Sequence, residues 1–209
     1  MTVATLHYIH DPLCGWCYAA QPLVSAVVDT LGDRVALKLH GGGLFDEPQT
    51  LEPELAEHIV HSDERIGSLS GQPFGKPYLE GLLADQGTVL FSLPPIAGVL
   101  AAQAIDARMA YPMLVAIQHA HYQQGLRVVE APVLAELAET LGLDGEAFQQ
   151  SFAKLQGTPT LEHVQDSRRL LGELVADRRG SGAGPPLAVD EDAGRGVEQT
   201  CHDTLRRRS

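Results

Sequence analysis

His10-Asp11-Pro12-Leu13-Cys14-Gly15-Trp16-Cys17 places two cysteines three positions apart, in a chain of 209 residues that contains only three. Upstream, residues 5–9 form the pattern of a β-strand that stops at Asp11-Pro12. Downstream, apolar residues recur with helical period from Trp16 to Leu31. The cysteine pair is therefore predicted to lie at the junction between a strand and a helix.

This predicted position has chemical consequences for the two thiols. The first turn of a helix has unpaired backbone N–H groups and the positive end of the helix dipole, and both stabilise a thiolate. The first cysteine of such a pair is usually the exposed nucleophile, with a pKa below the free value of about 8.5, and the second resolves the mixed disulfide. We therefore expect Cys14 to attack and Cys17 to resolve.

Other interpretations of the pair are a structural disulfide, half of a metal site and two unrelated core thiols. A disulfide across two residues closes too short a loop to add much stability. A zinc site needs two more ligands, and no second C-x-x-C or C-x-x-H follows. The spacings of His58, His61, His119 and His121 do not favour a metal site either. We expect a redox pair and no bound metal.

Composition excludes several classes of partner. The formal net charge is −12, the isoelectric point is about 5.1, and the basic residues are dispersed apart from Arg206, Arg207 and Arg208, so nucleic acid is not expected as a partner. The sequence has neither a signal-peptide pattern nor an apolar stretch long enough to span a bilayer. We expect a cytoplasmic protein, in which disulfides are transient and catalytic.

Residues 4–41 are predicted to form a strand-helix-strand unit. Residues 35–39 alternate between apolar and polar side chains, which is typical of a strand with one buried face. A helical crossover between two strands makes them parallel, with a right-handed connection. Gly41, Gly42 and Gly43 then end the second strand, in a flexible turn that could let a ligand approach the backbone.

From about residue 50 to residue 180 helical patterns replace the strand pattern. Pro94-Pro95 can open one helix, and apolar stripes indicate further helices near residues 133–141, 148–155 and 159–178. A glycine- and proline-rich stretch at residues 180–186 ends the last of them, and residues 187–189 have the composition of a short strand. The sequence therefore predicts an α/β protein in which a helical layer interrupts the strand-containing part.

Together these features resemble the thioredoxin superfamily, and specifically the cytoplasmic, FrnE-like branch of the DsbA-like oxidoreductases. The most specific likeness is residues 8–18, YIHDPLCGWCY, and Pro22, five residues after the second cysteine, adds to it. Residues 71–75, GQPFG, and Ala120-His121-Tyr122 with Gly125 also look like family segments. The resemblance covers most of the chain.

The resemblance implies a thioredoxin fold with an inserted all-helical domain. Residues 1–45 and 180–209 would form the discontinuous thioredoxin-fold domain, and residues 46–179 the helical insertion, whose last helix returns to that fold. A cis-proline is expected to face the cysteines. We expect it at Pro185 rather than Pro159, because a strand-like segment follows Pro185 and only an X-Pro bond is readily cis. The implied site comprises the catalytic Cys14 and Cys17, supported by Gly15, Trp16, Asp11, Pro12 and Pro185.

Three functions compete. The first is thiol-disulfide exchange with protein or small-molecule thiols and disulfides, with no cofactor beyond the redox-active disulfide and with glutathione as a candidate co-substrate. The second is a glutathione-dependent transferase or isomerase similar to the kappa class, which generally has Ser in place of the first cysteine. The third is a non-enzymatic metal- or redox-sensing module. The presence of both Cys14 and Cys17 favours the first, and Cys201 is interpreted as incidental.

Overall fold

The computed structural model describes residues 4–180, with side chains for residues 4–174. The chain divides into two compact units, residues 1–168 and residues 169–209. The first unit contains the strands and helices α1 to α6 described below, together with the start of α7. The described part of the second unit is the remainder of α7, which spans Thr158–Gly180.

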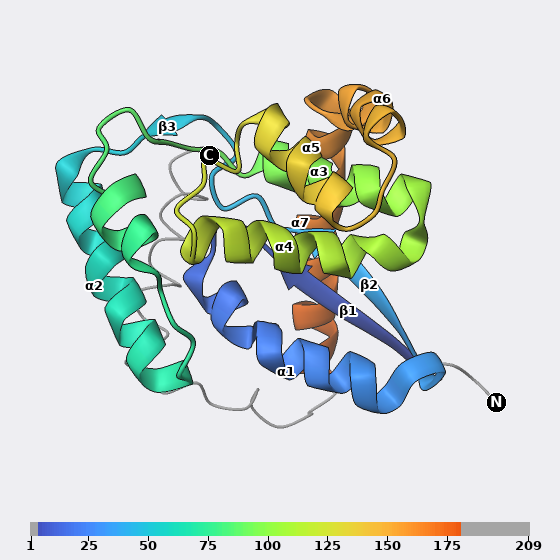
Figure 1. Ribbon diagram of the computed structural model, residues 1–209. Coiled ribbons are helices and arrows are strands. Elements are labelled where there is room, and N and C mark those ends of the chain that lie inside the picture. Colours follow the sequence, from blue (N-terminus) through green and yellow to red (C-terminus); the bar gives the residue numbers. More distant parts are fainter. Residues whose placement is uncertain (1–3, 181–209) are drawn as a thin grey trace. The chain divides into compact units, whose positions relative to one another are not determined.

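A parallel strand pair connected by one helix forms the base of the first unit (Figure 1). Strand β1 spans Ala4–His10, helix α1 spans Gly15–Leu31, and strand β2 spans Val35–Gly41, after a short 3₁₀ turn at Gly32–Arg34. Ala4 pairs with Val35 and His10 with Gly41 at the two ends of the ladder. The predicted strand-helix-strand unit and its parallel pairing are therefore confirmed.

The glycines that end β2 allow side chains of α3 and α7 to pack closely against the backbone. A Cβ atom on Gly41 would lie 2.7 Å from Cγ2 of Ile96, and one on Gly43 would lie 2.6 Å from Cγ1 of Val164. Gly43 also has a φ of +67°, which glycine adopts without steric cost. Helices α3 and α7 therefore occupy the space at this turn, where the glycines had indicated that a ligand could approach the backbone.

Helices make up most of the chain from residue 53 onward. Proline near the first position opens α2, α3 and α5, where its missing N–H has no intrahelical partner to lose. The elements are α2 Pro53–Ser70, the π-helix η2 Pro77–Leu82, α3 Leu93–Ile105, the 3₁₀ turn η3 Ala107–Met109, α4 Ala110–Tyr122, α5 Ala131–Thr140 and α6 Gly145–Leu155. Two short strands, β3 Gln49–Thr50 and β4 Val89–Leu90, pair in antiparallel fashion and add a little β structure that the sequence pattern did not reveal.

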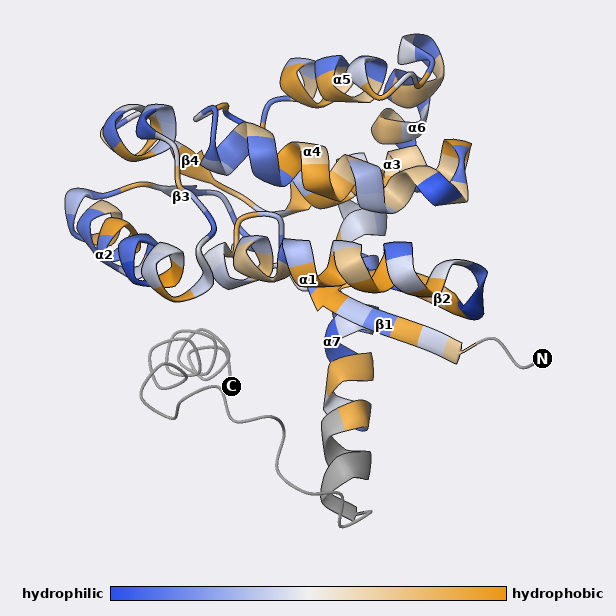
Figure 2. Cartoon of the chain, turned by 60° about the horizontal axis from the view of Figure 1, so that its bottom comes forward, coloured by the Kyte–Doolittle hydropathy of each residue, from blue (hydrophilic) through white to orange (hydrophobic). Residues whose placement is uncertain are grey.

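The main core lies among helices α3 to α6. Its central members include Met113, Leu114, Ile117, Leu134 and Phe148, each with a relative exposure of 0%. Alternating apolar and polar colours along α2 and α5 in Figure 2 mark them as amphipathic, with one side available for burial. Tyr111 of α4 connects this core to α1, because its hydroxyl donates to the carbonyl of Gln21 at 3.0 Å.

A second cluster of buried side chains lies at the start of α1. It contains Tyr18, Tyr78 and Tyr122, together with four leucines: Leu51, Leu82, Leu83 and Leu90. The site described below is built on this cluster. Among the residues that the structure describes, no helix is both long enough and apolar enough to cross a membrane.

Candidate redox site

Cys14 is the N-cap residue of α1. Its backbone is extended, with φ −98° and ψ 115°, its N–H donates to the carbonyl of Asp11 at 3.2 Å, and its carbonyl accepts from the N–H of Tyr18 at 3.0 Å. Cys17 lies in the first turn of the same helix. Both residues are partly exposed and both are free thiols. The predicted strand-to-helix junction therefore places the pair where backbone N–H groups are unpaired.

The pKa of Cys14 is lowered from its ordinary value. A hydrogen bond from the Cys17 thiol is the largest cause, and the backbone N–H groups of Cys17 and Trp16 act in the same direction. Burial and the nearby carboxyl group of Asp11 oppose them. The first turn of α1 therefore favours a thiolate at Cys14, in agreement with the sequence argument, although a neighbouring thiol contributes more than the helix end.

The pKa of Cys17 is shifted in the opposite direction. Its hydrogen bond to Cys14 raises this pKa most, and burial and the charge of Cys14 add to the effect, while the N–H of Asp11 opposes it. That N–H donates to Sγ of Cys17 at 3.5 Å. The hydroxyl of Tyr8 also donates to the carbonyl of Cys17 at 3.1 Å. The two thiols are therefore chemically unequal, with the charge placed on Cys14.

Asp11 is a buried carboxyl group under the pair, with 4% relative exposure. Its Oδ1 accepts from the N–H of Leu13 at 2.8 Å and from the hydroxyl of Ser92 at 3.0 Å, and its Oδ2 accepts from the N–H of Leu44 at 2.6 Å. Burial raises the pKa of Asp11, and these hydrogen bonds lower it. The residue thereby ties the loop before α1 to the turn after β2 and to the start of α3.

The segment at residues 71–75, one of the two predicted family segments, contacts α1. Pro22 lies inside the helix and has no N–H to donate to the carbonyl of Tyr18. The side chain of Gln72 donates to that carbonyl instead, at 3.4 Å. The Tyr18 hydroxyl donates to the carbonyl of Pro73 at 2.9 Å and accepts from Gln123 at 2.6 Å. Residues from α2 onward therefore fix the turn that contains Cys17.

Aromatic rings fill the space behind that turn. The rings of Tyr18 and Tyr122 stack with their centroids 4.6 Å apart, and Tyr78 meets Tyr122 edge to face at 5.1 Å. His121 is 4% exposed and lies 5.0 Å from the ring of Tyr78. Burial lowers the pKa of His121 to about 4, so this histidine is neutral near pH 7. The predicted family segment at residues 120–122 is thus part of the support for the site.

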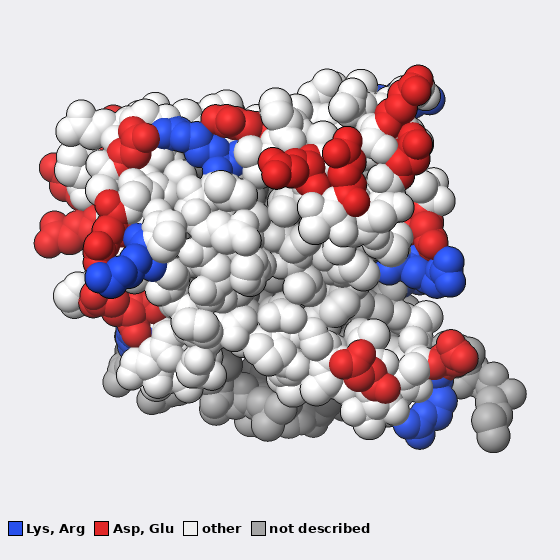
Figure 3. Space-filling model, viewed as in Figure 1, with Lys and Arg blue, Asp and Glu red and all other residues white. Residues whose placement is uncertain are grey.

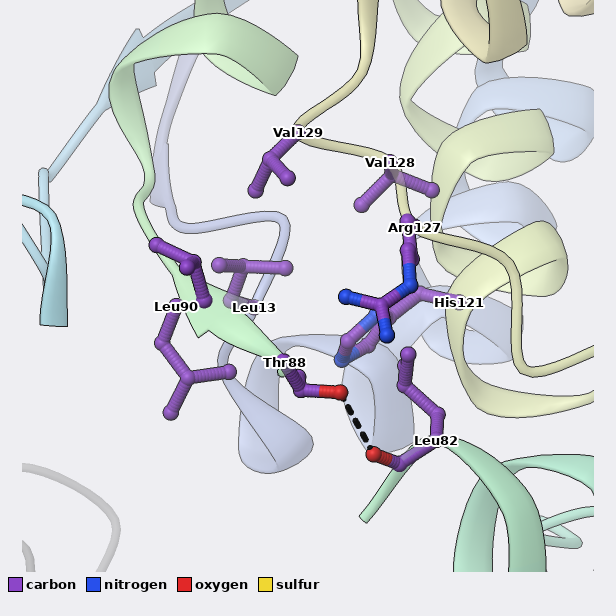
Figure 4. Close-up of a pocket in the computed structure, with 9 residues that line it drawn as sticks. Leu13, Leu82, Thr88, Leu90, His121, Arg127, Val128 and Val129 are labelled. Carbon is purple, nitrogen blue, oxygen red and sulfur yellow. Dashed lines mark hydrogen bonds between the residues drawn. The ribbon is translucent and has the colours of Figure 1, made fainter. Parts of the chain in front are cut away.

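A small cavity lies beside this support (Figure 4). It has a volume of about 10 Å³ and is lined by Leu13, Leu90, Val128 and the side chains of His121 and Arg127, among others. That volume suits a single water molecule. His121 lines the cavity, and its buried Nδ1 atom has no hydrogen-bond partner among the described residues.

The other residues predicted from the sequence have these positions. Gly15 and Trp16 are partly exposed in the first turn of α1, and Pro12 is buried before it. The bond before Pro159 is trans, as are all peptide bonds among the described residues, and Pro159 lies in the first turn of α7. Pro185 and Cys201 lie outside the described residues. Within the part of the chain with described side chains, no three His, Cys, Asp or Glu residues are arranged to hold a metal ion.

Four residues that contribute to the site were not predicted from the sequence: Tyr8, Ser92, Tyr78 and Asp63. Tyr8, which belongs to the motif at residues 8–18, donates a hydrogen bond to the carbonyl of Cys17, and Ser92 donates one to Asp11. Their partners are distant in sequence or on another element, so no local pattern indicates them. Asp63 does leave a signal, because it occupies the apolar side of α2 between Ile59 and Ile66, where a charged residue is unusual.

A cysteine pair at the start of a helix that crosses between two parallel strands, with a set of helices packed against it, is the arrangement of a thioredoxin-fold disulfide oxidoreductase. No protein-family model and no curated protein sequence matches the chain. Among solved structures it is similar to DsbM of Pseudomonas aeruginosa, described as a cytosolic disulfide reductase and solved with GSH. The identity is 42%, the match covers 98% of this chain and 100% of that one, and the TM-score is 0.76.

The chain therefore belongs to the DsbA-like family of thiol-disulfide oxidoreductases, and it is an enzyme of that family. A protein of Nitrosomonas europaea assigned as a protein disulfide isomerase is 21% identical over the full length of both chains, with a TM-score of 0.68, and supports the fold alone. The predicted α/β class, a thioredoxin fold with a helical insertion, is confirmed. The boundaries proposed for the two domains stay a prediction.

Proposed function

We propose that this enzyme exchanges disulfides through Cys14 as the nucleophile and Cys17 as the resolving thiol. The observation that carries the proposal is the inequality of the two sulfur atoms. The pKa of Cys14 is lowered first by the Cys17 thiol and then by backbone N–H groups, whereas the pKa of Cys17 is raised. A thiolate is the attacking species in exchange, so Cys14 is ready to attack while Cys17 keeps its proton.

The exchange proceeds in two balanced steps. The Cys14 thiolate attacks one sulfur of a substrate disulfide, so that a Cys14–substrate bond forms, the substrate S–S bond breaks, and the leaving thiolate takes up a proton. Cys17 then loses its proton and attacks Sγ of Cys14, which forms the Cys14–Cys17 disulfide and releases the second substrate thiol. Two electrons pass from the cysteine pair to the substrate.

We further propose that glutathione is the electron donor and that the enzyme works as a reductase in the cytoplasm. Two glutathione molecules would reduce the Cys14–Cys17 disulfide and leave as glutathione disulfide. The support is the relationship to DsbM, which is described as a cytosolic disulfide reductase and was solved with GSH. This relationship also favours exchange over the transferase and metal-module hypotheses.

Insulin reduction tests the exchange chemistry. The native enzyme should accelerate reduction of insulin by dithiothreitol, Cys14→Ser should reduce the rate to that of dithiothreitol alone, and Cys201→Ser should match the native rate. A Cys14→Ser variant that keeps the native rate would refute the proposal. Glutathione, recycled by glutathione reductase and NADPH, should replace dithiothreitol; failure to consume NADPH would refute its role as donor.

A trapping experiment tests the assignment of the two roles. Without the resolving thiol, Cys17→Ala should accumulate a mixed disulfide with the substrate, and mass spectrometry should locate it on Cys14. Location of the adduct on Cys201 would overturn the assignment.

A further inference from the structure

Asp63 is the buried carboxyl group of helix α2. Acidic side chains gather on the surface over α2 (Figure 3), and Glu57 and Glu64 are exposed on this helix. Asp63 differs from them, because it is 4% exposed and its Oδ2 accepts a hydrogen bond from the hydroxyl of Tyr78 at 2.7 Å. A carboxyl group is costly to bury unless it is paired or has a use. The one described partner is neutral, so pairing with a cation does not explain its burial.

The second oxygen of this carboxyl group lies against the cysteine motif. A Cβ atom on Gly15 would overlap Oδ1 of Asp63 and would lie 3.0 Å from Cδ1 of Ile66. Gly15 is the first residue of α1 and directly follows Cys14. The absence of a side chain at this motif position therefore allows the Asp63 carboxyl group to reach the helix end that carries the thiols.

Tyr122 connects the same groups from the other side. Burial raises the pKa of its hydroxyl, and Tyr78, Asp63, Cys14 and Cys17 raise it further through their charges. These four groups therefore lie around one buried phenol. Tyr78 from η2 donates to Asp63, and Cys14 and Cys17 from α1 share with Asp63 the surroundings of Tyr122 from α4. None of these described titratable groups is a cation.

Because Oδ1 of Asp63 lies against Gly15, directly beside Cys14, and none of the described groups named above is a cation, a negative charge on Asp63 repels a negative charge on Cys14. Burial raises the pKa of Asp63 to about 7, and the hydrogen bond from Tyr78 opposes that shift. Near neutral pH the carboxyl group thus exists in both forms. Its ionised form disfavours a second negative charge at Cys14, and a less stable thiolate makes the dithiol form less stable relative to the disulfide.

We propose that Asp63 is a positioning residue of the redox site. Its carboxyl group accepts a hydrogen bond from Tyr78 and lies against Gly15. From this position it sets the stability of the Cys14 thiolate and thereby the reducing power of the cysteine pair. This proposal rests on the exchange function proposed above. The ionised carboxyl group makes the pair a stronger reductant, and the protonated group makes it a weaker one.

The experiment compares native enzyme with Asp63→Asn at two pH values. The asparagine side chain mimics the neutral acid in shape. At pH 6, where Asp63 is mostly protonated, both proteins should have similar equilibrium constants against glutathione and glutathione disulfide. At pH 8 the variant should favour its dithiol form by at least about threefold more than the native enzyme. Equal constants at both pH values would overturn the proposal, and so would a difference that does not change with pH.

Two further variants separate a specific role from a structural one. Glu64→Gln removes an exposed carboxylate from the same helix and should leave the constants at native values at both pH values; a shift equal to that of Asp63→Asn would overturn the proposal. Tyr78→Phe keeps Asp63 but removes its hydrogen bond, so the pH at which the native constant changes should move upward. An unmoved transition would count against the proposal, even where Asp63→Asn fails to fold.

The outcomes also separate this proposal from the exchange function. Loss of insulin reduction in Cys14→Ser together with a pH-independent Asp63→Asn would refute the role of Asp63 alone. Native activity in Cys14→Ser would refute the exchange function itself.

Discussion

The backbone N–H of Asp11 points at Sγ of Cys17 across 3.5 Å, while the carboxyl group of the same residue is buried among Leu13, Leu44 and Ser92. The two ends of Asp11 have opposite effects on Cys17. The N–H lowers the pKa of that thiol, and the carboxyl group raises it. One residue therefore both supports the resolving sulfur and limits its ionisation.

We expect Asp11→Asn to lower the stability of the fold and to lower the pKa of Cys14. An asparagine NH₂ group in place of Oδ2 would face the N–H of Leu44, and an unsatisfied buried pair of this kind costs about 1–3 kcal/mol. Loss of the negative charge should also lower the pKa of Cys14. Urea unfolding and iodoacetamide alkylation against pH measure the two effects. Native stability together with a native alkylation midpoint would contradict the hydrogen-bond arrangement.

The alkylation midpoint of Cys14 should rise when Cys17 is replaced by alanine. The hydrogen bond from the Cys17 thiol is the largest cause of the lowered pKa of Cys14, so its loss should move the midpoint up towards the value of a free thiol. Cys17→Ser is the matched control, because its hydroxyl can still donate, and it should give a lower midpoint than Cys17→Ala. Both are measured in a Cys201→Ser background. Identical midpoints in the two variants would assign the shift to the helix end alone.

Asp63→Asn should gain stability relative to the native enzyme as the pH rises. The pKa of Asp63 is raised from 3.8 to about 7, so the folded state holds this proton more tightly than the unfolded state does. The resulting stability is fully present below pH 3.8 and is lost as the pH rises through 7. A shift of this size corresponds to about 4 kcal/mol, and asparagine does not incur the loss. Urea unfolding at pH 5 and pH 8 should show a larger advantage for the variant at pH 8; a constant difference would contradict the shift.

Gly75→Ala should be strongly destabilising. A Cβ atom at this position would overlap the carbonyl oxygen of Gln123 and lie 2.8 Å from its carbon, and backbone cannot move aside as a side-chain end can. Such overpacking costs about 1–3 kcal/mol or more. Gly81→Ala is the control, because nothing lies within 4 Å of a Cβ atom there. Thermal unfolding of both variants tests this, and equal melting temperatures would refute the close approach.

The local parts of the fold were predictable because each has its own signal in the sequence. The alternation at residues 35–39 and the helical period after Trp16 were sufficient to place β2 and α1, and Pro94-Pro95 marked the start of α3. The pair β3 and β4 was missed, because two-residue strands are too short to set a period. The strand and cis-proline expected around Pro185 lie outside the described residues.

The environment of the thiols was predictable only in part. The N-cap position of Cys14 and the proximity of Asp11 follow from residues close together in the chain. Asp63 reaches Gly15 across 48 residues of sequence, and Ser92 reaches Asp11 across 81. Spacing along the chain contains no information about such tertiary contacts. The glycines at the end of β2 were visible in the sequence, but a run of glycines is compatible either with the approach of a ligand or with close packing against helices.

The hydrogen bond from Gln72 to the carbonyl of Tyr18 replaces the backbone hydrogen bond that Pro22 removes from α1. A helix end normally frays on its own, one amide at a time. Here the turn after Cys17 shares a bond with a segment more than fifty residues away, so its opening requires that segment to open as well. The amides of this turn should therefore exchange their hydrogens with solvent in step with residues 72–75, as one cooperative unit.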